Sequence, residues 1–183
     1  MLESEIIAHC APTLAGLKTA NMFSYKAADM ELLEREIRDG NEKLNGKGVF
    51  IDVLKTGEAR VLVYVYRKKR LQRDLCREEV RCILADCGYE DPEPADCIRC
   101  LKRRFSGTEC FPHEVGLFLG YPLSDVVGFI EQKGKNYKCA GIWKVYGNEE
   151  ETRDLFRKLK RCTDVYIRHF ARGASITKLT VAA

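Results

Sequence analysis

The sequence predicts an α+β fold in which several helices pack a small, largely antiparallel sheet. Segments with helical periodicity outnumber β-rich runs, and two of those runs, residues 49–54 and 59–66, flank a Lys-Thr-Gly-Glu turn typical of a hairpin. The chain has 183 residues, of which 45% are hydrophobic, enough for one core of ordinary size. We therefore expect a single compact domain over residues 1–183.

The first quarter of the chain predicts three helical segments and a strand. Residues 2–9 have a helical pattern that Pro12 is expected to end, and Pro12 itself fits the first position of a second helical turn. Residues 21–25 are expected to form a short strand. Asp29 is a suitable N-cap for an amphipathic helix to about Leu44.

The middle of the chain continues with a strand and helices. In the second hairpin strand, residues 61, 63 and 65 share one face and residues 62, 64 and 66 the other, and both faces are apolar enough to be covered. Helical periodicity then extends to Cys87, with Gly88 at the position after the C-cap, and returns over residues 96–105.

The last third predicts short helices, a fourth strand and a long helix. Pro112 and Pro122 each fit the first position of a short helix. Residues 141–146 are expected to join the sheet as a strand. Asn148, with Glu three residues later, resembles a capping box for a long helix that Gly173 ends.

Composition excludes several classes of protein. Acidic residues follow Met1, where a secretory signal would carry Lys or Arg, and the longest apolar run, residues 61–66, cannot cross a bilayer. The sequence therefore predicts a cytoplasmic protein with no membrane partner. Nine cysteines cannot all pair with one another, and in the reducing cytosol we expect them to stay free and mostly to fill the core.

The net charge of +4 is small for a nucleic-acid-binding protein of this size. Basic clusters at residues 67–70, 102–104 and 157–161 are interpreted as solvated helix faces. Residues 114–130 are also compatible with a helix–turn–helix, although Asp125, near the start of the second helix, would repel phosphate. Nucleic-acid binding therefore stays open as an alternative.

Two segments far apart in the sequence carry the first candidate site. If Pro12 opens a helix, Cys10 lies just before its N-terminus, where the helix dipole favours a thiolate nucleophile or metal ligand. His113 and Glu114 are expected in the first turn of another helix, where a neutral imidazole suits a base or ligand. The alternative interpretations are a buried cysteine at a kink and a hydrogen-bonded surface histidine.

Further candidates are weaker. Trp143 and Lys144 are candidates to line a cofactor cleft at a strand end, and Cys162 is a candidate third metal ligand, although each is also typical of packing. Cys97 and Cys100 form a CxxC pair on a helix, but no second pair completes a structural zinc site. No phosphate-binding loop, dinucleotide fingerprint or nucleophile elbow is present.

Several segments together resemble one bacterial family of about this length, found mostly in anaerobic Gram-positive bacteria and known only as a domain of unknown function. The similarity covers nearly the whole chain, and residues 111–122 are its most specific part. The segments are HCAPTLAGLK (9–18), NMFS (21–24), VYR (65–67), FPHEVGLFLGYP (111–122), DVVGFI (125–130), WKVYG (143–147), KRCT (160–163) and LTV (179–181).

The resemblance implies a stand-alone cytoplasmic protein and supplies no activity. An association with iron-handling and flavodoxin neighbours implies a metal or redox role. The positions it marks are Cys10, His113, Glu114, Trp143, Lys144 and Cys162.

The first functional hypothesis is therefore a metal- or cofactor-binding or redox-linked protein with a Cys/His pocket that binds iron, another metal, a metal-bearing cofactor or a small molecule. A nucleic-acid-binding regulatory module and a non-catalytic adaptor are the alternatives. The sequence does not decide whether the protein is an enzyme, nor its oligomeric state.

Overall fold

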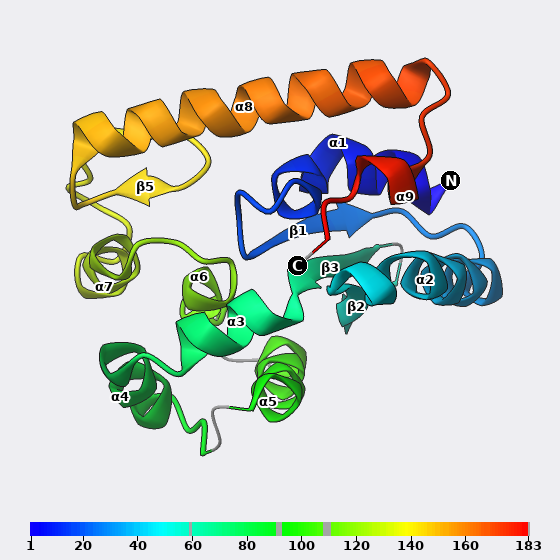
Figure 1. The fold of residues 1–183 in the computed structure, drawn as a ribbon. Coiled ribbons are helices and arrows are strands. Elements are labelled where there is room, and N and C mark those ends of the chain that lie inside the picture. The colour runs from blue at the N-terminus through cyan, green and yellow to red at the C-terminus, as the bar shows by residue number, and fades with distance from the viewer. Residues whose placement is uncertain (59, 91–92, 108–110, 183) are drawn as a thin grey trace. The chain divides into compact units, whose positions relative to one another are not determined.

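The computed structural model describes residues 1–58, 60–90, 93–107 and 111–182 and confirms the predicted α+β class (Figure 1). Contacts within the chain group it into two compact units. Unit 1 comprises residues 1–71 and 162–183, and unit 2 comprises residues 72–161. The expectation of one domain over residues 1–183 stays a prediction.

Unit 1 contains an antiparallel three-stranded sheet in the order β1-β3-β2. Its strands are β1 (Ala20–Tyr25), β2 (Val49–Thr56) and β3 (Val61–Arg67). The predicted hairpin is confirmed, with a register shift between Val53 and Lys55 in β2. Ala59, with which the predicted second strand began, lies outside the described residues.

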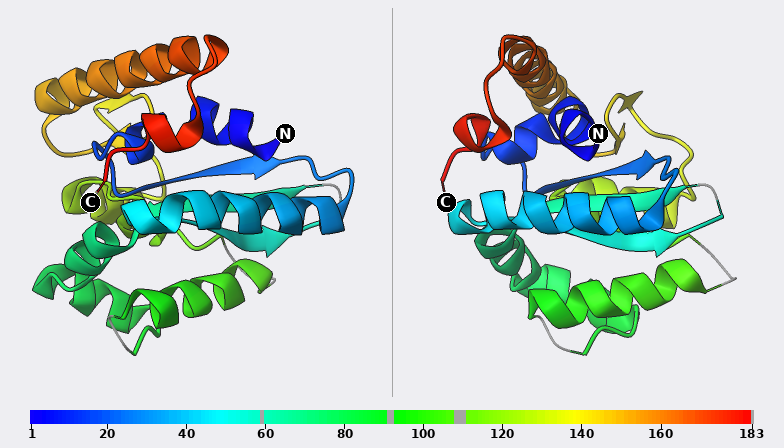
Figure 2. Two further views of the ribbon diagram at one scale, coloured as in Figure 1. Left: turned by 45° about the vertical axis from the view of Figure 1, so that its right-hand side comes forward. Right: turned by 90° about the vertical axis from the view of Figure 1, so that its right-hand side faces the viewer.

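Helices cover the face of this sheet that carries alternate residues of β3. They are α1 (Leu2–Leu14), α2 (Met30–Leu44) and the short α9 (Ile176–Leu179), and their apolar side chains join Val61, Val63 and Val65 in one buried cluster. Figures 1 and 2 show α1 along the sheet with α9 beside it. Asp29 caps α2 as predicted, and a 3₁₀ turn, η1 (Asn45–Lys47), follows that helix.

Helix α1 corrects one prediction, because it runs through Pro12 rather than ending before it. Proline lacks one backbone N–H, so α1 loses a single internal hydrogen bond close to its C-terminal end. Burial of the flanking Ala11 and Leu14 in the core offsets that loss. The predicted second helix start at Pro12 is therefore wrong.

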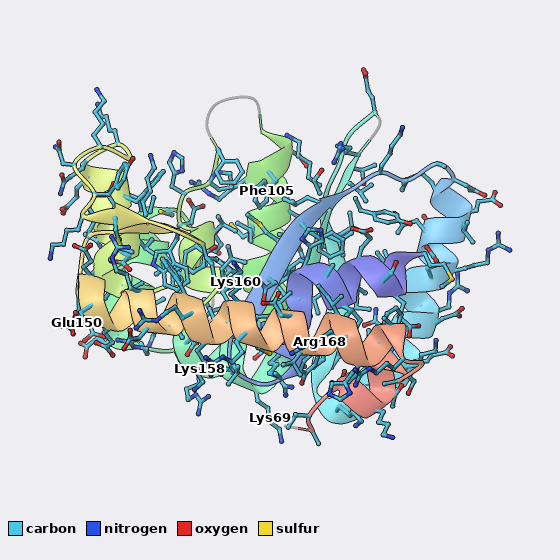
Figure 3. The ribbon with its side chains drawn as sticks, turned by 90° about the horizontal axis from the view of Figure 1, so that it is seen from above. Lys69, Phe105, Glu150, Lys158, Lys160 and Arg168 are labelled. Atoms are coloured by element: carbon cyan, nitrogen blue, oxygen red, sulfur yellow. The ribbon has the colours of Figure 1, made fainter. Side chains whose placement is uncertain are left out.

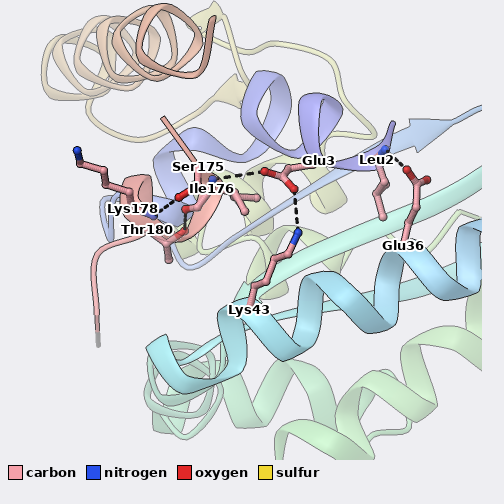
Figure 4. A network of polar contacts seen from close by, with 8 residues as sticks. All are labelled: Leu2, Glu3, Glu36, Lys43, Ser175, Ile176, Lys178 and Thr180. Atoms are coloured by element: carbon pink, nitrogen blue, oxygen red, sulfur yellow. Dashed lines mark hydrogen bonds and ion pairs between the residues drawn. The ribbon is translucent and has the colours of Figure 1, made fainter. Parts of the chain in front are cut away.

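A polar network joins α1, α2 and α9 at the edge of this core (Figure 4). The two carboxylate oxygens of Glu3 accept from Ile176 N at 3.4 Å and pair with Lys43 Nζ at 3.3 Å. Glu36 accepts from Leu2 N at 3.1 Å. These contacts attach the start of α1 to helices that are distant in the sequence.

Arg67 corrects the interpretation of the cluster at residues 67–70 as a solvated face. Its side chain is only 4% exposed. Its guanidinium donates to Thr13 O at 2.6 Å, Leu14 O at 2.6 Å and Val181 O at 2.8 Å. A forked donor with five N–H groups suits three converging carbonyls, so Arg67 attaches the C-terminal segment to the end of α1.

Unit 2 is mainly helical. Helix α3 (Lys68–Leu75) leads into it, and α4 (Glu78–Asp86), α5 (Pro94–Ser106), α6 (Val115–Phe118) and α7 (Leu123–Glu131) follow. The helix predicted up to Cys87 is thus two helices, and Gly88 has the expected positive φ of 86°. The predicted helix over residues 96–105 is confirmed as part of α5.

The long helix α8 (Glu149–Ala171) begins as predicted at Asn148, whose Oδ1 accepts from Glu151 N at 3.3 Å. Glu150 lies near its start, and Lys158, Lys160 and Arg168 follow along it (Figure 3). These basic side chains are exposed, which confirms a solvated face for the cluster at residues 157–161.

The predicted strand over residues 141–146 is confirmed only at Lys144–Val145, and its expected place in the main sheet is wrong. A two-stranded ladder of β4 (Cys139–Ala140) and β5 (Lys144–Val145) replaces it, separate from the sheet of unit 1. Gly141 lies between them, and a Cβ placed there would be 2.4 Å from the ring of Phe156. Because of this close approach, only glycine fits at position 141, where the chain turns between the two strands. No helix in the described ranges is long and apolar enough to cross a membrane.

Candidate functional site

Cys10 does not have the position expected of a thiolate. It lies inside α1 rather than before a helix N-terminus, and its relative exposure is 0%. Burial raises the pKa of its thiol, because a charged sulfur would lose its hydration. Cys10 and His113 belong to different units, so the predicted pocket between them stays a prediction.

Lys18 is a buried cation close to Cys10. Its side chain is 5% exposed, and its Nζ donates to Ala20 O at 2.6 Å. Burial lowers the pKa of this lysine to about 7, and the thiolate form of Cys10 would oppose that shift. The sequence contains no local signal that would distinguish this lysine from a surface one.

The pKa of Lys18 predicts a pH-dependent stability. Between pH 7 and 8.5 the unfolded chain carries the Lys18 proton and the folded chain loses it, so stability rises with pH. The expected slope from this group is about 1 kcal/mol per pH unit, and it disappears below the folded pKa. Urea titrations of wild type and Lys18→Met across this range test it, and parallel pH profiles would contradict it.

Glu114 is buried and is held by hydrogen bonds from two neighbouring side chains. It is 3% exposed, and its Oε1 accepts from Tyr89 Oη at 3.0 Å and from Arg104 Nε. The charge of the guanidinium compensates the buried carboxylate. His113 is exposed and precedes α6, whose N-cap is Glu114, so the prediction that His113 lies in the first turn of a helix is wrong.

His113 instead belongs to a row of aromatic rings. The His113 ring centroid lies 4.9 Å from that of Phe129 and 5.7 Å from that of Phe111. Phe111 in turn meets the buried Phe105 edge-on at 5.3 Å. Phe111 is 53% exposed, so the row begins in the core and continues onto the surface of unit 2.

Lys144 extends this row from Phe129 to Tyr137. Its Nζ lies 5.7 Å from the Phe129 ring centroid and 4.8 Å from that of Tyr137, both within cation–π range. The same ammonium donates to Gly134 O at 2.8 Å, which fixes its position. We call Phe111, His113, Phe129, Tyr137 and Lys144 the aromatic–lysine surface.

The loop that carries Tyr137 has an unusual backbone. Lys133 and Asn136 have positive φ values of 51° and 56°, a backbone conformation that residues other than glycine rarely adopt. Lys138 Nζ donates to Gly147 O at 2.6 Å and closes the loop onto the next turn. Lys133 and Lys135 are exposed, so the loop adds two cations beside the rings.

Trp143 is a core residue rather than the wall of a cleft. It is 9% exposed, stacks on Tyr121 at 4.4 Å and meets Phe156 edge-on at 4.6 Å. Its Nε1 donates to Asp125 Oδ2 at 2.7 Å. Of the two candidate cofactor-binding residues, only Lys144 therefore contributes to the aromatic–lysine surface.

Asp125, which the sequence predicts to repel phosphate, is buried, and both of its carboxylate oxygens accept hydrogen bonds within the protein. Its Oδ1 accepts from Tyr146 N at 2.8 Å and Gly147 N at 2.7 Å. Helix α6 has four residues, too few for the first helix of a helix–turn–helix. The interpretation of residues 114–130 as such a motif is therefore not supported.

The predicted metal ligands do not gather in the described part of the chain, which contains no group of three or more His, Cys, Asp or Glu side chains placed to hold a metal ion. Cys162 lies half-buried on α8, and burial raises the pKa of its thiol. The sequence signal for a metal site therefore finds no support in this geometry.

Comparisons with known proteins agree with the family resemblance. No curated protein and no solved structure matches the chain. A family model described as "Protein of unknown function (DUF3793)" matches residues 6–180, nearly the whole length. The chain therefore belongs to this family of proteins of unknown function.

Proposed function

We propose that the protein binds single-stranded nucleic acid on the aromatic–lysine surface of unit 2. The observation that carries the proposal is Lys144, whose ammonium lies within cation–π distance of both Phe129 and Tyr137, while Phe129 also contacts the ring of His113. Aromatic rings stack on bases without regard to sequence, while lysines neutralise the phosphates between them. Rings interleaved with cations are the pattern that this type of binding requires.

The openness of the surface favours a polymer over a single nucleotide. Phe111 and Tyr137, at the two ends of the row, are 53% and 44% exposed. Pockets for small cofactors usually bury most of their ligand, whereas single strands lie along open grooves. A duplex would also fit poorly, because its paired bases cannot stack on protein rings.

The other hypotheses have less support. A metal or redox role for Cys10 and His113 requires access to Cys10, which has no exposed surface. An adaptor role is the stronger alternative, since Ile130, on α7 beside Phe129, and Ile142, in the turn before β5, are 39% and 46% exposed. An adaptor would contact a protein partner through these apolar side chains and would not respond to oligonucleotides.

Removal of the exposed rings tests the proposal. We expect wild-type protein to bind fluorescein-labelled dT₁₂ and rU₁₂, and Phe111→Ser/Tyr137→Ser to bind at least tenfold more weakly, because each stacked base contributes about 1–3 kcal/mol. Fluorescence anisotropy in 50 mM salt measures this. Met30→Ser/Leu32→Ser, which removes exposed apolar side chains of unit 1, is the matched control. Absence of wild-type binding would overturn the proposal.

Neutralisation of the loop lysines gives a second prediction. For single strands, each phosphate contact adds about 0.7 to the slope of log K against log salt. We expect Lys133→Gln/Lys135→Gln to reduce that slope by about 1.4, whereas Lys26→Gln/Lys55→Gln, an equal charge change at exposed sites in unit 1, leaves it unchanged. Equal reductions in both variants would indicate a response to net charge alone and contradict a site at this loop.

A further inference from the structure

Six of the nine cysteines lie between residues 76 and 110, within unit 2. Cys110 lies outside the described residues. Cys76 and Cys82 are exposed, Cys97 is buried, and Cys87 and Cys100 are half-buried. Cys87 lies at the end of α4 and Cys100 lies on α5, and the two thiols are close enough to interact electrostatically.

Cys87 is the C-cap of α4, and Gly88 follows it with the positive φ that turns the chain towards α5. The thiol of Cys100, on α5, lies 3.8 Å from Gly88 O. One turn further along α5, Arg104 Nη1 donates to Cys87 O at 3.1 Å. Two side chains of α5 thus hold the end of α4 that carries Cys87.

We propose that Cys100 and Cys87 form a redox-active dithiol that exchanges with low-molecular-weight disulfides. Cys100 lines a hollow of about 260 Å³ together with Cys97, two arginines, Arg99 and Arg103, and two acidic residues, Glu90 and Asp96. The hollow lets a small disulfide reach the sulfur, and its mixed charges suit a disulfide that carries both carboxylates and amines, such as oxidised glutathione. This inference is independent of nucleic-acid binding.

The surroundings of the two cysteines assign them different roles. Cys100 faces the hollow and is the attacking thiol. Burial and the carboxylate of Glu114 raise the pKa of Cys87, against the opposing effect of Arg104, which suits the thiol that reacts second. This division matches a nucleophilic cysteine followed by a resolving one.

The thiol–disulfide exchange takes place in two steps. The Cys100 thiolate attacks one sulfur of RSSR, which forms a Cys100–S–S–R bond and releases RS⁻, and that anion takes up the proton lost by Cys100. Cys87 then loses its proton and attacks Cys100 Sγ, which forms the Cys87–Cys100 disulfide and releases a second RSH. The two protein thiols are oxidised, and RSSR is reduced to two thiols.

Cys97 is the other possible partner, because it precedes Cys100 by one helical turn. It also lines the hollow, but it is 1% exposed, whereas Cys100 is half-buried. Within a continuous helix, the backbone holds the two side chains of a CxxC pair one turn apart. The cross-helix pair requires no change within α5, so it is the expected disulfide.

Reaction of the full-length native protein with oxidised glutathione tests the proposal. After alkylation and digestion, mass spectrometry should find Cys87 and Cys100 in one cross-linked peptide pair. Cys87→Ser should trap a glutathione adduct on Cys100, and Cys100→Ser should yield neither product. Cys76→Ser/Cys82→Ser should behave as wild type at the pair, because these exposed thiols lie outside it.

Two results of the same experiment would contradict the proposal. A Cys97–Cys100 cross-link, or glutathione on Cys76 and Cys82 with Cys87 and Cys100 still alkylated, would overturn the proposal. Circular dichroism of each serine variant establishes that it is folded, so a lost product reports on the thiol. Oligonucleotide binding by reduced wild type is unaffected by either result, which keeps the two proposals separable.

Discussion

Asp125→Ala is expected to destabilise the protein by about 3 kcal/mol or more. One carboxylate accepts hydrogen bonds from the Trp143 indole and from the backbone N–H groups of Tyr146 and Gly147. Removal of the carboxylate leaves these donors without a partner in a buried site, and each unsatisfied buried donor costs about 1–3 kcal/mol. The turn that precedes α8 would lose its attachment to α7.

Trp143 is the only tryptophan, so its fluorescence reports directly on this site. Urea denaturation followed by tryptophan emission should show a lower midpoint and a red-shifted native spectrum for Asp125→Ala. Glu131→Ala, at an exposed carboxylate of the same helix, is the control and should change stability by less than about 0.5 kcal/mol. Similar midpoints for the two variants would contradict the role of Asp125.

Arg67→Ala is expected to cost a similar amount, about 3 kcal/mol, and Arg67→Lys should recover only part of it. The guanidinium donates to three carbonyl oxygens from α1 and the C-terminal segment. A lysine ammonium is a point donor and cannot reproduce the planar fork. The loss should free the segment around Val181, whose N–H donates to Leu14 O at 3.0 Å.

Circular dichroism during thermal denaturation measures this effect, and limited proteolysis reports release of the C-terminus. Arg60→Ala is the control, because the exposed Arg60 side chain makes a long contact, to Ser24 Oγ at 3.3 Å. If Arg67→Lys were as stable as wild type, a single charge would suffice and the forked geometry would be irrelevant.

Much of the fold could be predicted because its signals are local. The α2 helix has a capping aspartate and an apolar stripe, and the hairpin of β2 and β3 has β-rich strands around a glycine turn. Asn148 and Gly173 likewise mark the ends of α8 through their own conformations. Each of these features depends on residues that are neighbours in sequence.

The predictions that proved wrong concern features that depend on tertiary contacts. Burial of Ala11 and Leu14 keeps α1 helical through Pro12, and the ring of Phe156 determines the turn at Gly141. The solvated-face interpretation of Arg67 failed because its carbonyl partners come from residues 13, 14 and 181. No local pattern in the sequence indicates that these carbonyls converge.

The candidate site was predictable only in part. His113 and Lys144 were selected from the sequence, but as members of separate sites, and Phe129, which contacts both, was interpreted as part of a helix. Tyr137 was missed because its loop has no regular periodicity. A run of three lysines around an aromatic residue over positions 133–138 is the signal that could have found it.

The most direct test of the nucleic-acid proposal is an NMR titration of ¹⁵N-labelled full-length protein with dT₁₂. We expect the largest amide shifts at residues 111–113, 129–138 and 144, and we expect these shifts to shrink as salt is raised. Shifts concentrated elsewhere in the chain, or a spectrum that dT₁₂ leaves unchanged at 50 mM salt, would contradict it.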